Sequence, residues 1–142
     1  ALKLMDEDVV AVASPDLCPP EDLDLDRFTQ LPRLQLQTRR SAWQQWYMRQ
    51  GLQDAQPVTI EFDQFATMLK AAEFGAGVAL MPRYLVENHL TEGRLITMKD
   101  AAPTSLGAYY LVWPEAMSDH PPVAAFRDWV GSLIAMPTRN NL

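Results

Sequence analysis

Residues 62–83, with the sequence FDQFATMLKAAEFGAGVALMPR, predict the end of a strand, a helix and a second strand in direct succession. From residue 58 to residue 63 apolar and polar side chains alternate, which is the period of a half-buried strand. From residue 65 the apolar spacing changes to three and four, which places one stripe on a helix. The stripe consists of Phe65, Met68, Leu69 and Ala72. We expect Asp63 to cap this helix, because a short carboxylate accepts hydrogen bonds from the free N–H groups of the first turn.

A glycine turn and a buried strand follow this helix. Gly75 and Gly77 are expected to supply the positive φ values that end the helix and turn the chain back. Residues 78–81 form a continuous apolar run closed by Pro82, which is typical of a strand covered on both faces. The segment therefore predicts a right-handed crossover between two parallel strands. Its helix begins beside the carboxyl end of a strand, where ligands bind in open α/β sheets, although most helix starts meet only water or a cap.

Composition limits the classes of protein that fit. The chain has 142 residues, enough for one domain or a part of one, and its 48% hydrophobic and 21% charged residues are typical of a globular protein. A net charge of −6 argues against nucleic-acid binding by this segment alone, because that binding needs clustered Lys and Arg. The single cysteine, Cys18, excludes an intrachain disulfide and suits a reducing compartment. No apolar run is long enough to cross a bilayer, so we expect a cytoplasmic protein without membrane contact.

The rest of the chain alternates between helical and strand patterns. Further helices are predicted at 21–28, 41–50, 84–90 and 122–135, and further strands at 9–13, 34–37, 95–98 and 108–113. This alternation indicates an α/β fold with a largely parallel sheet. In the helix at 41–50, Ser41 and Gln44 fit a capping box, and Gly51 ends the helix. Its two tryptophans and Tyr47 are expected in the core rather than as a stacking platform for a ligand.

Residues that could carry catalysis form no recognisable motif. His89 and His120 lack a second ligand three or four residues away, so we expect surface histidines and no metal site. No G-x-S-x-G turn is present, and Gly75-Ala76-Gly77 lacks a third glycine and follows a helix instead of a strand. Cys18 is expected to be a packing residue. The carboxylates of Glu61, Asp63 and Glu73 show no pairing that would raise a pKa, so an enzyme is disfavoured.

Several segments in order resemble one family. The central stretch continues to Gly93-Arg94-Leu95 and is followed by YYLVWP at 109–114 and PPVAAFRDWV at 121–130. Upstream lie DEDVVAVASPDL at 6–17 and AWQQWYMRQGL at 42–52. Together these segments resemble the effector-binding domain of LysR-type transcriptional regulators over roughly residues 2–134. Within the family, the aromatic strand is most similar to that of the glycine-cleavage and β-lactamase-type activators.

The resemblance implies a fold and a domain plan. The fold would be an α/β three-layer sandwich of the type II periplasmic-binding-protein kind, with an effector between two subdomains joined by two crossovers. Residues 1–8 would end the first subdomain and form the first crossover, and residues 9–107 would form the second subdomain. Residues 108–142 would form the return crossover, a helix that packs on the first subdomain, and a tail. Most of the first subdomain and the helix-turn-helix would be missing, so the aromatic face of the last helix would be exposed.

The resemblance also implies partners and site residues. The chain would sense a small-molecule effector, form a homodimer or homotetramer, reach DNA only through the absent domain, and need no cofactor. The implied effector-binding residues are Asp63, Gln64, Phe65, Leu80, Met81 and Tyr109. The implied dimer interface consists of Val58, Ile60, Phe62, Met68, Leu69 and Phe74. Phe65 stands where relatives often carry a small hydroxyl residue, which favours a smaller or more apolar effector, unless Phe65 simply packs in the core. The alternatives are a solute-binding fragment of a transport system with the same fold, and a small α/β enzyme.

Overall fold

The computed structural model describes residues 1–20, 24–53, 57–58, 60–98 and 101–136. The chain divides into two compact units. The larger unit spans Asp8–Leu106, and the smaller unit combines Ala1–Glu7 with Gly107–Leu142. Two strands, β1 (Leu2–Ala13) and β6 (Thr104–Leu111), contribute residues to both units and pair with each other.

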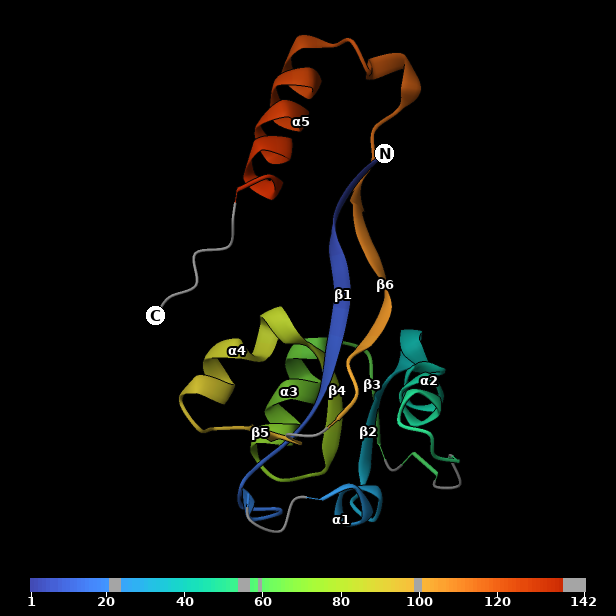
Figure 1. Cartoon of the computed structure of the whole chain (residues 1–142), viewed down its shortest axis with the longest axis vertical. Helices are drawn as coiled ribbons and strands as arrows, with labels where there is room; N and C mark the ends of the chain where they lie inside the picture. The colour runs from blue at the N-terminus through green and yellow to red at the C-terminus, as the bar shows by residue number, and fades with distance from the viewer. Residues whose placement is uncertain (21–23, 54–56, 59, 99–100, 137–142) are drawn as a thin grey trace. The chain divides into compact units, whose positions relative to one another are not determined.

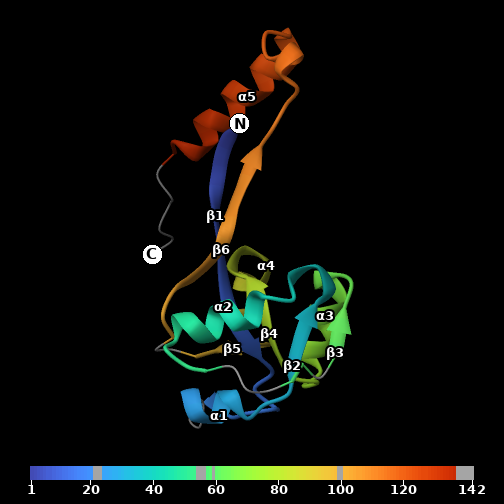
Figure 2. The same ribbon diagram turned by 90° about the vertical axis from the view of Figure 1, so that its right-hand side faces the viewer.

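The larger unit is built on a mixed sheet with the strand order β3-β2-β4-β1-β5 (Figure 1). Its further strands are β2 (Arg33–Leu36), β3 (Ile60–Phe62), β4 (Val78–Pro82) and β5 (Ile96–Thr97). β2 pairs in parallel with both β3 and β4, so the three arrows point the same way (Figure 2). β1 runs antiparallel to β4 and β5. The expected parallel strands on either side of the central helix are confirmed, with β2 between them.

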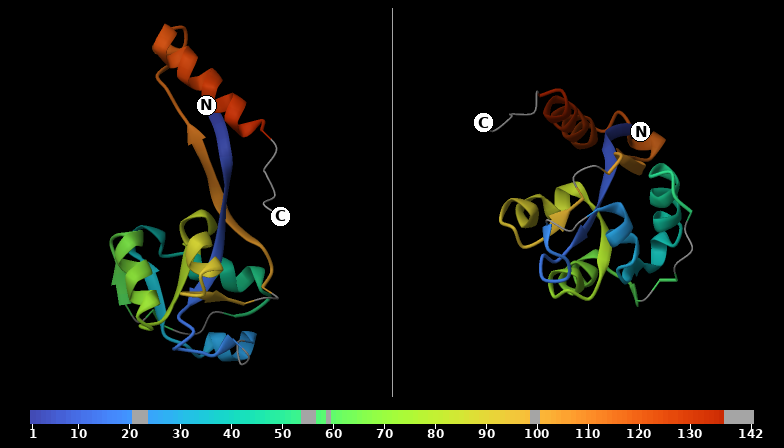
Figure 3. Two further views of the ribbon diagram at one scale, coloured as in Figure 1. Left: turned by 90° about the vertical axis from the view of Figure 1, so that its left-hand side faces the viewer. Right: turned by 60° about the horizontal axis from the view of Figure 1, so that its bottom comes forward.

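Helices cover both faces of this sheet, which makes three layers (Figure 3). In the larger unit these are α1 (Leu25–Thr29), α2 (Ala42–Arg49), α3 (Phe65–Glu73) and α4 (Arg83–Thr91). α1 and α2 pack on one face and α3 and α4 on the other. β4 shows the division residue by residue: Val78 and Leu80 face the α1–α2 layer, whereas Ala79 and Met81 face the α3–α4 layer. The predicted strand with both faces covered is therefore confirmed.

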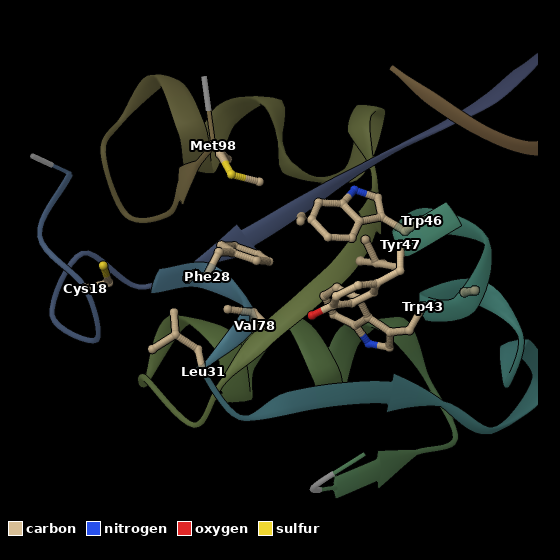
Figure 4. Packing of buried hydrophobic residues seen from close by; sticks show 12 residues of the cluster. Cys18, Phe28, Leu31, Trp43, Trp46, Tyr47, Val78 and Met98 are labelled. Atoms are coloured by element: carbon tan, nitrogen blue, oxygen red, sulfur yellow. The ribbon is translucent and has the colours of Figure 1, made fainter. Parts of the chain in front are cut away.

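Aromatic side chains fill the α1–α2 layer, as predicted (Figure 4). The Trp46 ring centre lies 5.6 Å from those of Phe28 and Trp43 and 5.3 Å from that of Tyr47. Trp43 Nε1 donates to the main-chain oxygen of Leu34 at 2.8 Å, which satisfies the indole and fastens α2 to β2. The guanidinium of Arg33 is buried with its carbon 4.3 Å from the Tyr47 ring centre, a distance at which a cation is attracted to a ring face.

Two predicted helix caps are wrong. Asp63 lies one residue too early, in an exposed bend, and the N-cap of α3 is Gln64 in an extended conformation without a side-chain cap bond. Ser41 caps no N–H group either, because a 3₁₀ turn (Gln37–Arg39) leads directly into α2 and leaves Ser41 already helical, with φ −89° and ψ −2°. Gln45 Nε2 instead donates to Ser41 Oγ at 3.0 Å. By contrast, Gly51 ends α2 with a φ of +74°, as expected.

The two glycines after α3 have different roles. Gly75 has a φ of +83° and turns the chain out of the helix, as predicted. Gly77 does not adopt a positive φ, so that prediction is wrong. It is needed for space, because a Cβ at this position would lie 2.5 Å from the main-chain oxygen of Pro32. That close approach accompanies the hydrogen bond from the Val78 N–H to the same oxygen at 2.8 Å.

Several element boundaries differ from the sequence predictions. β1 is more than twice as long as expected and carries the acidic run at 6–8 within it, with Glu7 buried. β2 is buried at every position instead of alternating, because Gln35 lies in the sheet and donates to Glu61 Oε1 at 3.3 Å. α1 begins at Leu25 behind the capping carboxylate of Asp24, and the expected start at 21–23 lies outside the described residues. β6 begins at Thr104 and ends before Trp113.

The last helix, α5 (Pro121–Ile134), belongs to the smaller unit and buries none of its residues. Its first turn contains two prolines, which lack the N–H that would be unpaired there. Phe126 and Trp129 are each more than half exposed, and their ring centres lie 5.9 Å apart. The expected exposed aromatic face is therefore present. Within the described residues, no helix is long and apolar enough to cross a membrane.

We expect Gly77→Ala to lower the free energy of unfolding by about 1–3 kcal/mol, because the new methyl group would press on the backbone of Pro32. Gly131→Ala is the matched control. That glycine lies within α5, where an added Cβ would meet nothing within 4 Å, so alanine should stabilise by about 0.5–1 kcal/mol. Urea unfolding followed by tryptophan fluorescence and circular dichroism measures both changes. An unchanged stability of the Gly77 variant would contradict the close approach.

Candidate functional site

The carboxyl ends of β2, β3 and β4 lie at one edge of the sheet, because the three strands are parallel. The segments that follow these strands bring polar and charged side chains to this edge. They are the 3₁₀ turn Gln37–Arg39, the start of α3 at residues 63–65, and the start of α4 at Arg83. The predicted arrangement of a helix start beside the carboxyl end of a strand is therefore present.

The start of α3 is open to solvent. Asp63 and Gln64 are exposed, and the side chain of the N-cap residue Gln64 makes no cap hydrogen bond to the first N–H groups of the helix. The main-chain oxygen of Gln64 is already used, since it accepts from Thr67 Oγ1 at 2.9 Å and from the Met68 N–H at 3.2 Å. The N–H groups of the first turn and the Gln64 amide can therefore donate to a ligand oxygen.

Phe65 packs in the core, which is one of the two roles that the sequence left open. Its side chain is half-buried and packs against the cluster under α3 and α4. The guanidinium carbon of Arg39 lies 5.5 Å from the Phe65 ring centre, so the ring also supports a cation at the strand-end edge. The sequence interpretation missed Arg39, because nothing in the pattern at residues 37–40 places it beside a residue 26 positions later.

Leu80 and Met81 do not lie on a common surface. As neighbours in β4 they point to opposite faces of the sheet, Leu80 into the α1–α2 layer and Met81 into the α3–α4 layer. Met81 has no exposed area, and Leu80 has almost none. Both residues therefore support the strand-end edge from within the core. Tyr109 is half-buried on β6 in the smaller unit.

The residues of the implied dimer interface differ widely in exposure. Ile60 is 41% exposed on β3, which ends the strand order, and Phe74 is 88% exposed at the C-terminal end of α3. Val58, Phe62 and Leu69 are half-buried. Met68 is only 1% exposed and belongs to the core beneath α3, so it has no surface to offer a partner. Ile60 and Phe74 are therefore the members most available for contact.

His89 is not the surface histidine that the sequence predicts, whereas His120 is exposed. Nε2 of His89, on α4, lies 2.8 Å from Oε1 of Glu73, at the end of α3, and both side chains are mostly buried. Lys70 Nζ approaches the other Glu73 oxygen at 3.3 Å. Glu73 and His89 lie on different helices and are 16 residues apart in the sequence. No periodic pattern indicates a contact over that separation. Among the described residues, no group of three His, Cys, Asp or Glu side chains could hold a metal ion.

The LysR substrate binding domain model matches residues 1–134. The chain belongs to this family. AmpR, an HTH-type transcriptional activator of Rhodobacter capsulatus, is 37% identical over 100 residues, which is 67% of this chain and 33% of that protein. The glycine cleavage system transcriptional activator of Escherichia coli K12 is 32% identical over 93 residues, which is 64% of this chain and 30% of that protein. The chain thus spans about a third of the length of the curated relatives it matches.

Solved structures of LysR-type regulators share the fold. The effector domain of AmpR from Pseudomonas aeruginosa has a TM-score of 0.81 and 25% identity, covering 94% of this chain and 64% of that one. The full-length virulence activator AphB of Vibrio cholerae has a TM-score of 0.71 and 17% identity, covering 92% of this chain and 46% of that one. The expected type II periplasmic-binding-protein-like α/β fold of LysR effector-binding domains is confirmed.

We expect Glu73→Gln to destabilise the larger unit by about 1–3 kcal/mol, because a neutral amide cannot replace the charged acceptor beside His89 and Lys70. Glu87→Gln is the control, since Glu87 is exposed on α4. Chemical unfolding at neutral pH compares the two variants with the unmodified chain. Equal stability of the two variants would show that the Glu73–His89 contact adds nothing to the packing of α3 on α4.

Proposed function

We propose that this chain is the effector-binding and oligomerisation part of a LysR-type transcription factor that senses a small metabolite. The match of the family model to residues 1–134 carries the proposal. The effector domain of AmpR, with its TM-score of 0.81, supports it. Binding of an effector to one conformation of such a domain would shift the population of the regulator and so change how its DNA-binding domains hold a promoter.

We infer that Asp63, Gln64 and Phe65 contact the effector. Three features support this inference: the uncapped N–H groups at the start of α3, the exposed Gln64 amide, and the Arg39 guanidinium beside the Phe65 ring. Leu80 and Met81 would set the position of this edge from inside the core. Tyr109 is proposed as a contact from the resemblance alone. Because Phe65 occupies space where relatives often have a small residue, the proposed effector is small or partly apolar.

We propose that oligomerisation uses the edge strand β3 and α3, where Ile60 and Phe74 expose apolar surface. An unpaired strand edge and exposed large side chains are typical of surfaces that pair with another chain. A homodimer or homotetramer would result. Binding to DNA is assigned to a part of the regulator outside these 142 residues, because their net charge of −6 repels phosphate.

We further propose that the chain has no catalytic role and acts in the cytoplasm. The relatives described above are named as transcriptional activators, which supports a regulatory role in preference to an enzyme or a transport protein. The same names disfavour the alternative of a solute-binding fragment of a transport system.

In the full-length regulator, we expect Gln64→Ala to reduce effector affinity by roughly fivefold to tenfold, the loss of one hydrogen bond to a ligand. A thermal-shift screen against metabolites first identifies the effector, and the variant is then titrated with it. Gln44→Ala is the matched control, because Gln44 is an exposed glutamine on α2, on the other face of the sheet. An unchanged affinity of the Gln64 variant would exclude this residue from the site.

We expect the 142-residue chain to show no salt-dependent binding to promoter DNA in a gel-shift assay, because it lacks the positive charge that releases counterions from DNA. The full-length regulator, tested at the same salt concentrations, serves as the positive control. Tight binding by the chain alone would contradict the assignment of DNA recognition to another part of the protein.

A further inference from the structure

A cavity of about 590 Å³ lies within the larger unit, between α1, the end of α4 and β5. Its volume is in the range of small-molecule sites, about 300–1,000 Å³. Leu25, Leu90, Leu95, Ile96 and Met98 supply apolar wall, and Asp24 and Gln50 supply polar atoms. All of these residues belong to the same unit, so the cavity exists without any contribution from the smaller one.

This cavity is separate from the proposed effector site. α1 precedes β2, and β5 pairs with Val12 and Ala13 at the end of β1, where β1 meets the start of β4. The cavity therefore lies at the amino edge of the parallel strands, whereas the start of α3 lies at their carboxyl edge. Figure 1 shows α1 and β5 together at that end of the larger unit.

Most polar atoms in the wall are already paired with the protein. Gln50 Nε2 donates to the Ala102 oxygen at 3.1 Å, and its Oε1 accepts from the Ala102 N–H at 2.8 Å. Thr97 Oγ1 donates to the Ala11 oxygen at 2.8 Å. The exception is Asp24, which is exposed and uses Oδ1 to accept from the Arg27 N–H at 2.8 Å. A carboxylate accepts several hydrogen bonds, so Asp24 keeps capacity for a ligand.

The charge of the wall selects among ligands. Among the described residues that line the cavity there is one carboxylate and no lysine or arginine. An anion would meet only Asp24 and apolar side chains, whereas a cation would gain a charge-assisted hydrogen bond. We propose that this cavity is a second binding site, for a small amine with a compact apolar body, its ammonium on Asp24 and its body against Leu25, Ile96 and Met98.

A ligand here would contact the segment that leads into β6. Ala101 lines the cavity, and the two residues after it are held by α2, since Gln50 binds Ala102 and Arg49 Nε donates to the Pro103 oxygen at 2.9 Å. The proposal does not rest on a regulatory role of the protein, because binding can be measured directly on the chain.

The test compares three probes of one shape and different head groups: benzylamine, benzyl alcohol and benzoate. Methyl NMR of the ¹³C-labelled protein follows Met98 and Ile96. Benzylamine is expected to shift both methyl signals along one saturable curve, benzyl alcohol to bind roughly fivefold more weakly, and benzoate not to bind. Absence of any shift with the amine at millimolar concentration, or equal binding of benzoate, overturns the proposal.

Two variants locate the binding. Asp24→Asn replaces one good helix cap with another, so the fold is maintained. We expect this variant to bind benzylamine as weakly as the unmodified chain binds benzyl alcohol. Asp26→Asn, at an exposed position of α1, is the control and should bind as the unmodified chain does. Ala101→Trp fills the cavity and should abolish binding of all probes. Undiminished binding to either the Asp24→Asn or the Ala101→Trp variant would place the amine elsewhere and overturn the proposal.

Discussion

The burial of β4 on both faces is the constraint on which the larger unit depends. Each residue of Val78–Pro82 is buried, so the strand is stable only if both sides of the sheet are covered by apolar side chains. The α1–α2 layer supplies large rings, and the α3–α4 layer supplies Met68, Ala72 and Val86. The same strand pairs with β2 and β1, so the layers and the sheet order are fixed around it.

The features predicted correctly from sequence are those that produce a local period. The apolar run at 78–81, the stripe from Phe65 to Ala72, and the aromatic face of α2 each repeat at the spacing of a strand or helix, and each is found where expected. The predictions that are wrong concern features that depend on a single backbone atom or on a residue far away in the sequence. Asp63 and Ser41 are suitable capping residues, but Asp63 lies one residue before the N-cap of α3 and Ser41 is already helical. Gly77 is required by the oxygen of Pro32, 45 residues earlier, which no local pattern reveals.

The geometry of the candidate site also depends on contacts between distant residues, which no local pattern indicates. Asp63 and Gln64 are implied by the family resemblance, and they lie where a helix begins beside the carboxyl end of a strand. Arg39 was missed because it reaches that edge through β2, whose pairing with β3 is a tertiary fact. The resemblance implies Leu80 and Met81 together, at the end of one strand, yet adjacent strand residues face opposite layers. Glu73 and His89 meet only because α3 and α4 cover the same face of the sheet.

The antiparallel course of β1 gives the larger unit two chemically different ends. At the carboxyl edge of β2, β3 and β4, the N–H groups of α3, the Gln64 amide and Arg39 favour oxygen atoms and negative charge. At the amino edge, β1 brings its own end beside β5, and the described residues in the wall of the cavity there carry one charge, the carboxylate of Asp24. A molecule suited to one edge is therefore poorly suited to the other. β4 runs from one edge to the other and is fully buried. A shift of either helix layer would therefore displace the strand at both edges.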